Sequence, residues 1–178
     1  MADAHARGIL VTGAVGVGKT SVAVAVASVL EASGRPYAVI DLDWLAWFRP
    51  ADGSEVTVQE MLSANLRAVW SAFRSAGVEW VVLARHVRTI EEVSALREAL
   101  SEVDLVTVRL DAPRDVLELR IRARDEGPEL EEHLGLLAAA ELQESFEDLV
   151  VNTARRTASE VAHDVLAASG WTAGTGRW

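Results

Sequence analysis

The stretch Gly13–Thr20, which reads GAVGVGKT, limits the fold of this chain more than any other. It matches the pattern G-x-x-x-x-G-K-[ST], in which glycine-rich backbone amides surround phosphate groups. We expect a short buried strand before it, at Gly8–Thr12, and a helix after it, over Ser21–Leu30. The helix would point its positive N-terminus at the bound anion. The sequence therefore predicts a nucleoside triphosphate site.

Two side chains of this loop are expected to act on the phosphates. Lys19 would contact the phosphate oxygens, and the Thr20 hydroxyl would bind Mg²⁺. Lys19 is the only lysine in a chain with sixteen arginines, at a position that favours a compact charge over a planar guanidinium. The residues expected to contact the nucleotide here are Gly13, Ala14, Val15, Gly16, Val17, Gly18, Lys19, Thr20 and Ser21.

Composition narrows the class of protein. A chain of 178 residues suits a single domain, 1–178, with a sizeable core. The net charge of −10 argues against a nucleic-acid partner, which needs clustered basic residues. Lys19 interrupts the apolar run near the N-terminus, and no other span of about 20 apolar residues occurs. We expect a cytoplasmic protein with no membrane segment.

Strands and helices are expected to alternate along the chain. After the phosphate loop we expect strands at 37–41, 80–85, 105–110 and 149–151. Capping boxes predict helices that begin at Thr57, Thr89 and Thr157, and two further helices are expected after Pro113 and over Glu129–Phe146. Residues 44–55 are expected to be irregular, and the tail 170–178 to be flexible. The prediction is an α/β fold, a five-stranded parallel sheet with helices on both faces.

With these elements assigned, the chain resembles the small P-loop kinases, the group of shikimate kinase, gluconate kinase and adenylylsulfate kinase. The resemblance covers about residues 8–169. It is carried by Gly13–Thr20, Asp41-Leu42-Asp43, the arginine-rich segment Arg120–Arg124, and Val150-Val151-Asn152-Thr153. It implies the strand order 2-3-1-4-5, ATP and Mg²⁺ as cofactors, and a mobile lid at about residues 120–135.

Asp41 and Asp43 follow the second strand at the edge where ligands bind in such sheets. If the strand continues, their side chains point the same way. One carboxylate there can hold a water on Mg²⁺, and another can accept the proton of a substrate hydroxyl. The resemblance assigns the metal to Asp41 and the acceptor to Asp43. The alternative is that both simply cap a turn after the strand.

The arginines of the lid segment are the next candidates. On a helix, Arg120 and Arg124 share a face, and Arg122 points elsewhere. The resemblance implies that these arginines cover the nucleotide and stabilise the transferred phosphoryl group, with Gly127-Pro128 as a hinge. They could instead complement the helix dipole. The resemblance also assigns the adenine loop to Asn152, Thr153 and Arg155.

The acceptor side is expected to include aromatic residues. Trp44 and Trp47 could wall a pocket for a sugar ring or an aromatic substrate, or pack a subdomain onto the core. Arg85 could bind an anionic or hydroxylated substrate group, or form a surface ion pair. The third strand leads to Arg85 and His86 and not to an acid, which argues against a generic ATPase. We expect no catalytic role for His86.

The sequence thus predicts an ATP-dependent kinase that phosphorylates a hydroxyl of a small-molecule acceptor. Three alternatives stay open at this point: a non-catalytic nucleotide sensor, a resistance or antibiotic-tailoring protein, and a nucleotide kinase. A nucleotide kinase would need arginines that face a substrate phosphate, and the candidates are Arg67, Arg74, Arg85 and Arg88. Expected partners are the acceptor, neither nucleic acid nor a membrane, and, as a further candidate, a second copy of the chain.

Overall fold

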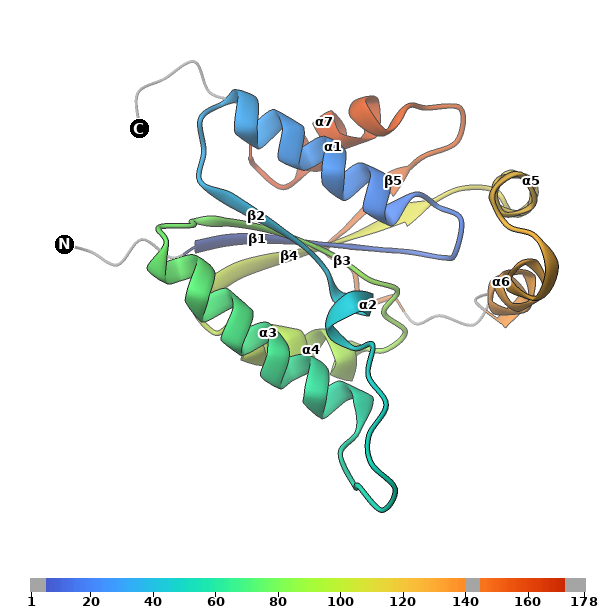
Figure 1. The fold of residues 1–178 in the computed structure, drawn as a ribbon. Coiled ribbons are helices and arrows are strands. Elements are labelled where there is room, and N and C mark those ends of the chain that lie inside the picture. The colour runs from blue at the N-terminus through green and yellow to red at the C-terminus, as the bar shows by residue number, and fades with distance from the viewer. Residues whose placement is uncertain (1–5, 140–144, 172–178) are drawn as a thin grey trace.

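Five parallel strands form the centre of the structure, in the order β2-β3-β1-β4-β5 (Figure 1). The computed structural model describes residues 6–139 and 145–171. The strands are β1 (Ala6–Thr12), β2 (Tyr37–Asp41), β3 (Trp80–Ala84), β4 (Val103–Asp111) and β5 (Leu149–Asn152). Both the order and the parallel direction confirm the predicted sheet.

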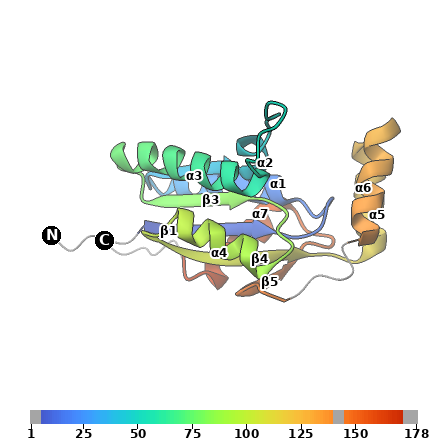
Figure 2. The same ribbon diagram turned by 90° about the horizontal axis from the view of Figure 1, so that it is seen from below.

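Helices cover both faces of this sheet, as predicted. Helices α1 and α7 lie together on one face, and α3 and α4 lie on the other (Figure 1). Helices α5 and α6 stand beyond the carboxyl ends of the strands, at the opposite end of the sheet from the start of β1 (Figure 2). The helices are α1 (Lys19–Ala32), α2 (Leu42–Leu45), α3 (Val58–Ser75), α4 (Ile90–Ala99), α5 (Arg114–Arg124), α6 (Gly127–Ala139) and α7 (Ala158–Ala168).

Helix α1 forms although its valines alternate with alanines as in a strand. Val22 and Val26 are buried against the sheet, whereas Val24 is exposed. Ala23, Ala27 and Leu30 are buried as well, so the buried positions recur every three to four residues, which is a helical spacing. The phosphate loop, which must continue into a helix, therefore determines the conformation of this segment. The alternation of valine and alanine does not determine it.

Threonine caps fix where three helices begin. Complete capping boxes join Thr57 to Glu60 at α3 and Thr157 to Glu160 at α7, as predicted. The box predicted at Thr89 is only half formed. The Thr89 hydroxyl accepts from the Glu92 amide, but the Glu92 carboxylate accepts from the amide of Arg88, one residue earlier.

The prediction of one helix over Glu129–Phe146 is wrong at both ends. Helix α6 begins earlier, at Gly127, because Pro128 suits the first turn of a helix, where no amide donor is needed. It is described as far as Ala139, and residues 140–144 lie outside the described part of the chain. Phe146 is not helical, and it packs against the core on the α3–α4 side of the sheet.

The predicted flexible tail also needs correction at its start. The indole of Trp171 is buried, and it packs edge-on against Trp80 with ring centroids 4.4 Å apart. The guanidinium of Arg35 lies 4.4 Å from the same Trp80 ring. Residues 172–178 lie outside the described part of the chain. Trp171 therefore belongs to the hydrophobic core between the sheet and α7.

Candidate active site

The loop between β1 and α1 has a backbone conformation that requires glycine. Gly13, Gly16 and Gly18 all have positive φ angles, of 133°, 80° and 100°. A Cβ atom on Gly13 would lie 2.4 Å from the carbonyl oxygen of Leu110, so no larger residue fits there. Gly18 is the N-cap of α1 in the left-handed conformation. The predicted phosphate-binding loop thus sits at a helix N-terminus, the setting that the motif requires.

Lys19 turns back over this loop. Its ammonium donates hydrogen bonds to the carbonyl oxygens of Gly13 and Ala14, each at 3.1 Å. Burial lowers the pKa of Lys19 to about 8, although the negative charge of Asp43 acts in the opposite direction. An anion in the loop would offset that desolvation, so the site favours a charged Lys19 once a phosphate is bound.

Asp41 lies beside the start of α1. Its Oδ2 accepts a hydrogen bond from the Thr20 hydroxyl at 3.2 Å, and its Oδ1 accepts from the amide of Asp43 at 3.1 Å. A hydroxyl and a carboxylate in contact are hard oxygen donors of the kind that Mg²⁺ prefers. The two residues predicted to bind the metal are therefore brought together, and their chemistry fits that ion.

Asp43 reaches the site by a different route from the one predicted. Strand β2 ends at Asp41, which caps the single helical turn α2, so Asp43 lies on that turn and not two residues further along a strand. Of the stretch 44–55, which was expected to be irregular, Trp44 and Leu45 are therefore helical. The Asp43 carboxylate accepts a hydrogen bond from Arg85 at 3.2 Å, and Arg85 itself is mostly buried. Two residues predicted to contact the acceptor thus form one ion pair.

A cleft of about 990 Å³ connects these groups, and we refer to it as the large cleft. Trp44 and Trp47 form its outer wall, with ring centroids 5.1 Å apart and exposed fractions of 69% and 76%. Neither ring packs a subdomain onto the core. The lining residues are Val15, Gly16, Gly18, Lys19, Thr20, Ser21, Asp41, Asp43, Trp44, Trp47, Arg124, Glu129, Glu132 and His133.

A second cleft, of about 340 Å³, lies on the other side of the phosphate loop, and we refer to it as the small cleft. Val22, Ala158 and Val161 give it an apolar floor, and Thr153 and three arginines lie around it. It shares Gly16, Gly18, Ser21 and Arg124 with the large cleft. A phosphate chain on the loop would therefore run from one cleft towards the other.

Only one of the three residues predicted to form the adenine loop lines the small cleft. Thr153 lines the small cleft, but Arg156 lines it in place of Arg155, which is exposed with a φ of 56°. Asn152 lies outside the lining and uses its Oδ1 to accept from the amide of Ala154. Arg156 is fixed by its ion pair with Asp164 at 2.7 Å.

Arg120 and Arg124 share one face of α5, as predicted, but they are held differently. Arg120 donates to the Thr153 carbonyl at 2.8 Å and to the Val17 carbonyl at 3.3 Å, and so joins the phosphate loop to the loop after β5. Arg124 lines both clefts and makes two hydrogen bonds to Asp125, at 2.6 and 2.8 Å. These bonds hold the pKa of the buried Asp125 down to about 2.

The sequence analysis missed one set of residues in the large cleft. Glu129, Glu132 and His133 face it from α6, and His133 bonds to Asp125 at 2.7 Å. Their spacing of three and four residues is the signal that could have identified this face. His86 was expected to have no catalytic role, and its Nδ1 lies 3.0 Å from the Gly13 carbonyl behind the loop. Because a carbonyl oxygen can only accept, Nδ1 donates this bond, and burial lowers the pKa of His86.

Not every candidate arginine lies at this edge of the sheet. Arg67 and Arg74 line a separate pocket between α3 and the end of α4, close to the start of β1. They therefore do not face the large cleft, contrary to what a nucleotide kinase would need. Arg85 is the candidate from that group whose guanidinium contacts a residue of the cleft.

Comparisons with known proteins show which solved structures have a similar fold. No family model matches the sequence, and no curated protein gives a significant match. Among solved structures, a gluconokinase from Sinorhizobium meliloti is 25% identical with a TM-score of 0.57, over 93% of each chain. The tunicamycin resistance protein of Deinococcus radiodurans is 21% identical with a TM-score of 0.65, over 94% of this chain and 97% of that one.

A third neighbour is an APS kinase of Mycobacterium tuberculosis in complex with AMPPNP and APS. It is 23% identical with a TM-score of 0.60, over 92% of this chain and 97% of that one. The structural neighbours thus form a group of P-loop kinases, and this chain has their fold. Among the described residues, no helix is both long enough and apolar enough to cross a membrane.

Proposed function

We propose that the protein is an ATP-dependent kinase that phosphorylates a hydroxyl group of a small molecule. The observation that carries this proposal is the grouping of Lys19, the Thr20–Asp41 pair and Asp43 in one cleft beside a glycine-rich loop. The similarity to a gluconokinase at 25% identity supports the same class of reaction. The two clefts on either side of the loop provide separate space for a nucleotide and an acceptor.

The two aspartates of the large cleft, Asp41 and Asp43, would have different roles. Thr20 and Asp41 would hold Mg²⁺, which supplies neutralising charge to the phosphates when bound. Asp43 would accept the hydrogen bond, and then the proton, of the acceptor hydroxyl. As the new O–P bond forms, the bond between the γ-phosphorus and the bridging oxygen breaks, and ADP leaves. Arg85 would hold the Asp43 carboxylate in position beside the acceptor, through their 3.2 Å ion pair.

Basic groups stabilise the charge on the transferred phosphoryl group. Lys19 would exchange its hydrogen bonds with the loop carbonyls for bonds to phosphate oxygens. Arg124, which lines both clefts, would reach the phosphates from α5. Positioning and charge provide most of the catalysis in such a transfer. We propose that α5 and α6 act as a lid, which excludes water from the closed site.

The acceptor would lie against Trp44 and Trp47. Two exposed indoles in contact form an apolar platform, which suits the face of a sugar ring or an aromatic ring. The base of ATP would occupy the small cleft, between the apolar floor and Arg120 or Arg156. Arg120 already joins the two loops that border this cleft.

The proposal is tested by incubating the protein with γ-labelled ATP, Mg²⁺ and a panel of sugars, sugar acids, aromatic alcohols and nucleoside monophosphates. We expect label on one hydroxyl compound, and Lys19→Ala, although folded, should transfer less than about 1% of it. Asp104→Asn, an exposed aspartate on β4 near the start of β1, is the control and should keep full activity. ATP binding without transfer to any compound would identify a sensor, and full activity of Lys19→Ala would refute the assigned role.

A further inference from the structure

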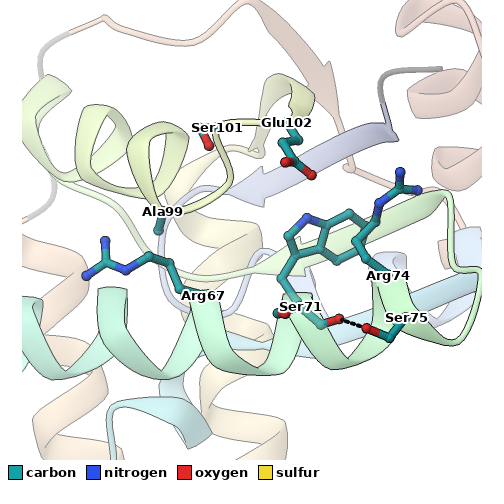
Figure 3. Close-up of a pocket in the computed structure, with 8 residues that line it drawn as sticks. Arg67, Ser71, Arg74, Ser75, Ala99, Ser101 and Glu102 are labelled. Atoms are coloured by element: carbon teal, nitrogen blue, oxygen red, sulfur yellow. Dashed lines mark hydrogen bonds between the residues drawn. The ribbon is translucent and has the colours of Figure 1, made fainter. Parts of the chain in front are cut away.

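A further pocket, separate from the large and the small cleft, lies at the other end of the molecule from the phosphate loop. It has a volume of about 470 Å³ and lies between the C-terminal half of α3 and the residues that end α4 (Figure 3). The Glu102 carbonyl accepts from the amide of Ala6, the first residue of β1, so this is the amino end of the strands. The volume suits a small organic molecule.

Hydrogen-bond donors dominate this pocket. Arg67, Ser71, Arg74 and Ser75 come from successive turns of α3, and Ser101 and Glu102 face them across the pocket (Figure 3). Arg74 is held in position by a bond from its Nη1 to the Val78 carbonyl, at 3.0 Å. Within the described part of the chain, Arg67 forms no ion pair. The pocket lining therefore contains two guanidinium groups and one carboxylate, a positive balance in a protein whose net charge is −10.

The lining also contains a buried donor without an acceptor. Trp70 lines the pocket with only 5% of its surface exposed, and its Nε1 has no hydrogen-bond partner among the described residues. An indole nitrogen can only donate, and a buried donor left without a partner is costly. A group that satisfies it must therefore present an acceptor atom at this position.

We propose that this pocket binds a small organic anion, a polyhydroxylated molecule with a carboxylate or a phosphate group. The anionic group contacts Arg67, an acceptor oxygen of the ligand takes the Trp70 indole hydrogen, and Glu102 accepts from a ligand hydroxyl. The serine hydroxyls adapt to either role. Because the pocket lies at the opposite end of the strands from the large cleft, it is a separate site and does not depend on the proposed kinase activity.

The indole of Trp70 provides a local probe for the test. The ¹H–¹⁵N spectrum of the full-length protein contains one indole signal for each of its six tryptophans, and Trp70→Phe identifies the signal of Trp70. The probes are ribose 5-phosphate, ribonate and ribose, which share a five-carbon skeleton and differ in charge. We expect the Trp70 signal to shift and saturate with one or both anions, which tells phosphate from carboxylate, and not to shift with ribose.

Variants distinguish this site from the large cleft. Arg67→Ala should weaken binding of the anion by about tenfold or more, since charged hydrogen bonds are the strong ones. Arg122→Ala removes the same charge elsewhere and should change it by less than about twofold. Lys19→Ala should bind the anion normally. The proposal is overturned if neither anion shifts the Trp70 signal, since the indole would then be bonded only to water. It is also overturned if ribose shifts the signal as much as the anions do, or if Arg67→Ala binds the anion as well as the native protein.

Discussion

At the scale of single residues, the ion pair between Asp43 and Arg85 is the most informative contact of the site. Arg85 is mostly buried and Asp43 is exposed at the cleft, so the guanidinium fixes the carboxylate without covering it. A carboxylate that is held in this way can receive a proton from an incoming hydroxyl with little reorganisation. The pair therefore links the end of β3 to the side of the cleft where we propose that the acceptor binds.

Asp43→Asn is expected to separate nucleotide binding from turnover. The amide keeps the size of the side chain but cannot accept a proton, so kcat should fall by about 100-fold or more. The Kd for ATP should change by less than about threefold, because Asp43 is assigned to the acceptor. Steady-state kinetics and calorimetry measure the two quantities. Unchanged turnover would move the proton acceptor to another residue.

Lys19 is expected to take up a proton when the nucleotide binds at alkaline pH. Its pKa is lowered to about 8 in the nucleotide-free protein, and phosphates should raise it again. Calorimetry in buffers of different ionisation enthalpy should give uptake of about one proton at pH 9 and close to none at pH 6.5. The affinity should therefore fall as the pH rises above 8.

The matched control for this measurement is Lys19→Arg, whose guanidinium stays protonated over the whole range. It should show no proton uptake at either pH. Equal uptake by both proteins, or release of a proton from the native one, would show that Lys19 does not titrate on binding.

At the scale of elements, α5 and α6 form a unit around a buried carboxylate. Asp125, between the two helices, accepts from Arg124 and bonds to His133 of α6. Arg124 is therefore positioned by the junction of the helices and not by the cleft alone. This arrangement explains how a side chain on an exposed surface of α5 can have a defined direction towards both clefts.

Two arginines of α5 offer a matched comparison of the lid. Arg124→Ala should lower kcat by about 100-fold, since a guanidinium that stabilises phosphoryl charge is worth at least that much. Arg122→Ala removes the same side chain from a different face of the helix and should keep kcat within about twofold. Both are measured with the acceptor identified in the labelling assay. Equal loss in the two variants would indicate a general effect on α5.

Local patterns predicted most of these elements because their causes are local. The loop motif and the capping boxes at Thr57 and Thr157 act over a few residues. The missed features depend on contacts between distant segments. The α2 turn brings Asp43 to Arg85, Arg156 takes the place expected for Arg155, and Phe146 packs against the opposite core. None of these has a signal within its own stretch of sequence.

At the scale of the whole molecule, the segment that follows α7 completes the core of the sheet. Trp171, three residues beyond the end of α7, packs edge-on against Trp80 on β3, the strand beside β1. The sequence analysis predicted the strand order from a resemblance, but it placed Trp171 in a flexible tail. A single apolar residue after a glycine carries no pattern, and only the packing of α7 shows that it is buried.

Trp171→Ala is expected to lower the free energy of unfolding by about 3–5 kcal/mol, the usual cost of removing a buried indole. Trp47→Ala is the control, because its ring is exposed, and it should change the same quantity by less than about 0.5 kcal/mol. Urea unfolding followed by circular dichroism measures both. Similar stabilities for the two variants would show that Trp171 contributes nothing to the folded state.

The stretch between β2 and α3 carries Asp43 and both exposed indoles, while the groups assigned to the nucleotide come from the first loop, α5 and the residues after β5. In the proposed kinase, selection of the acceptor and binding of ATP would therefore depend on separate segments of the chain. If the proposal is right, another sequence at residues 44–56 should change the compound that is phosphorylated and leave nucleotide binding unchanged, with the Thr57 cap of α3 kept in place. Evolution of a new substrate preference would then require substitutions in this one segment only.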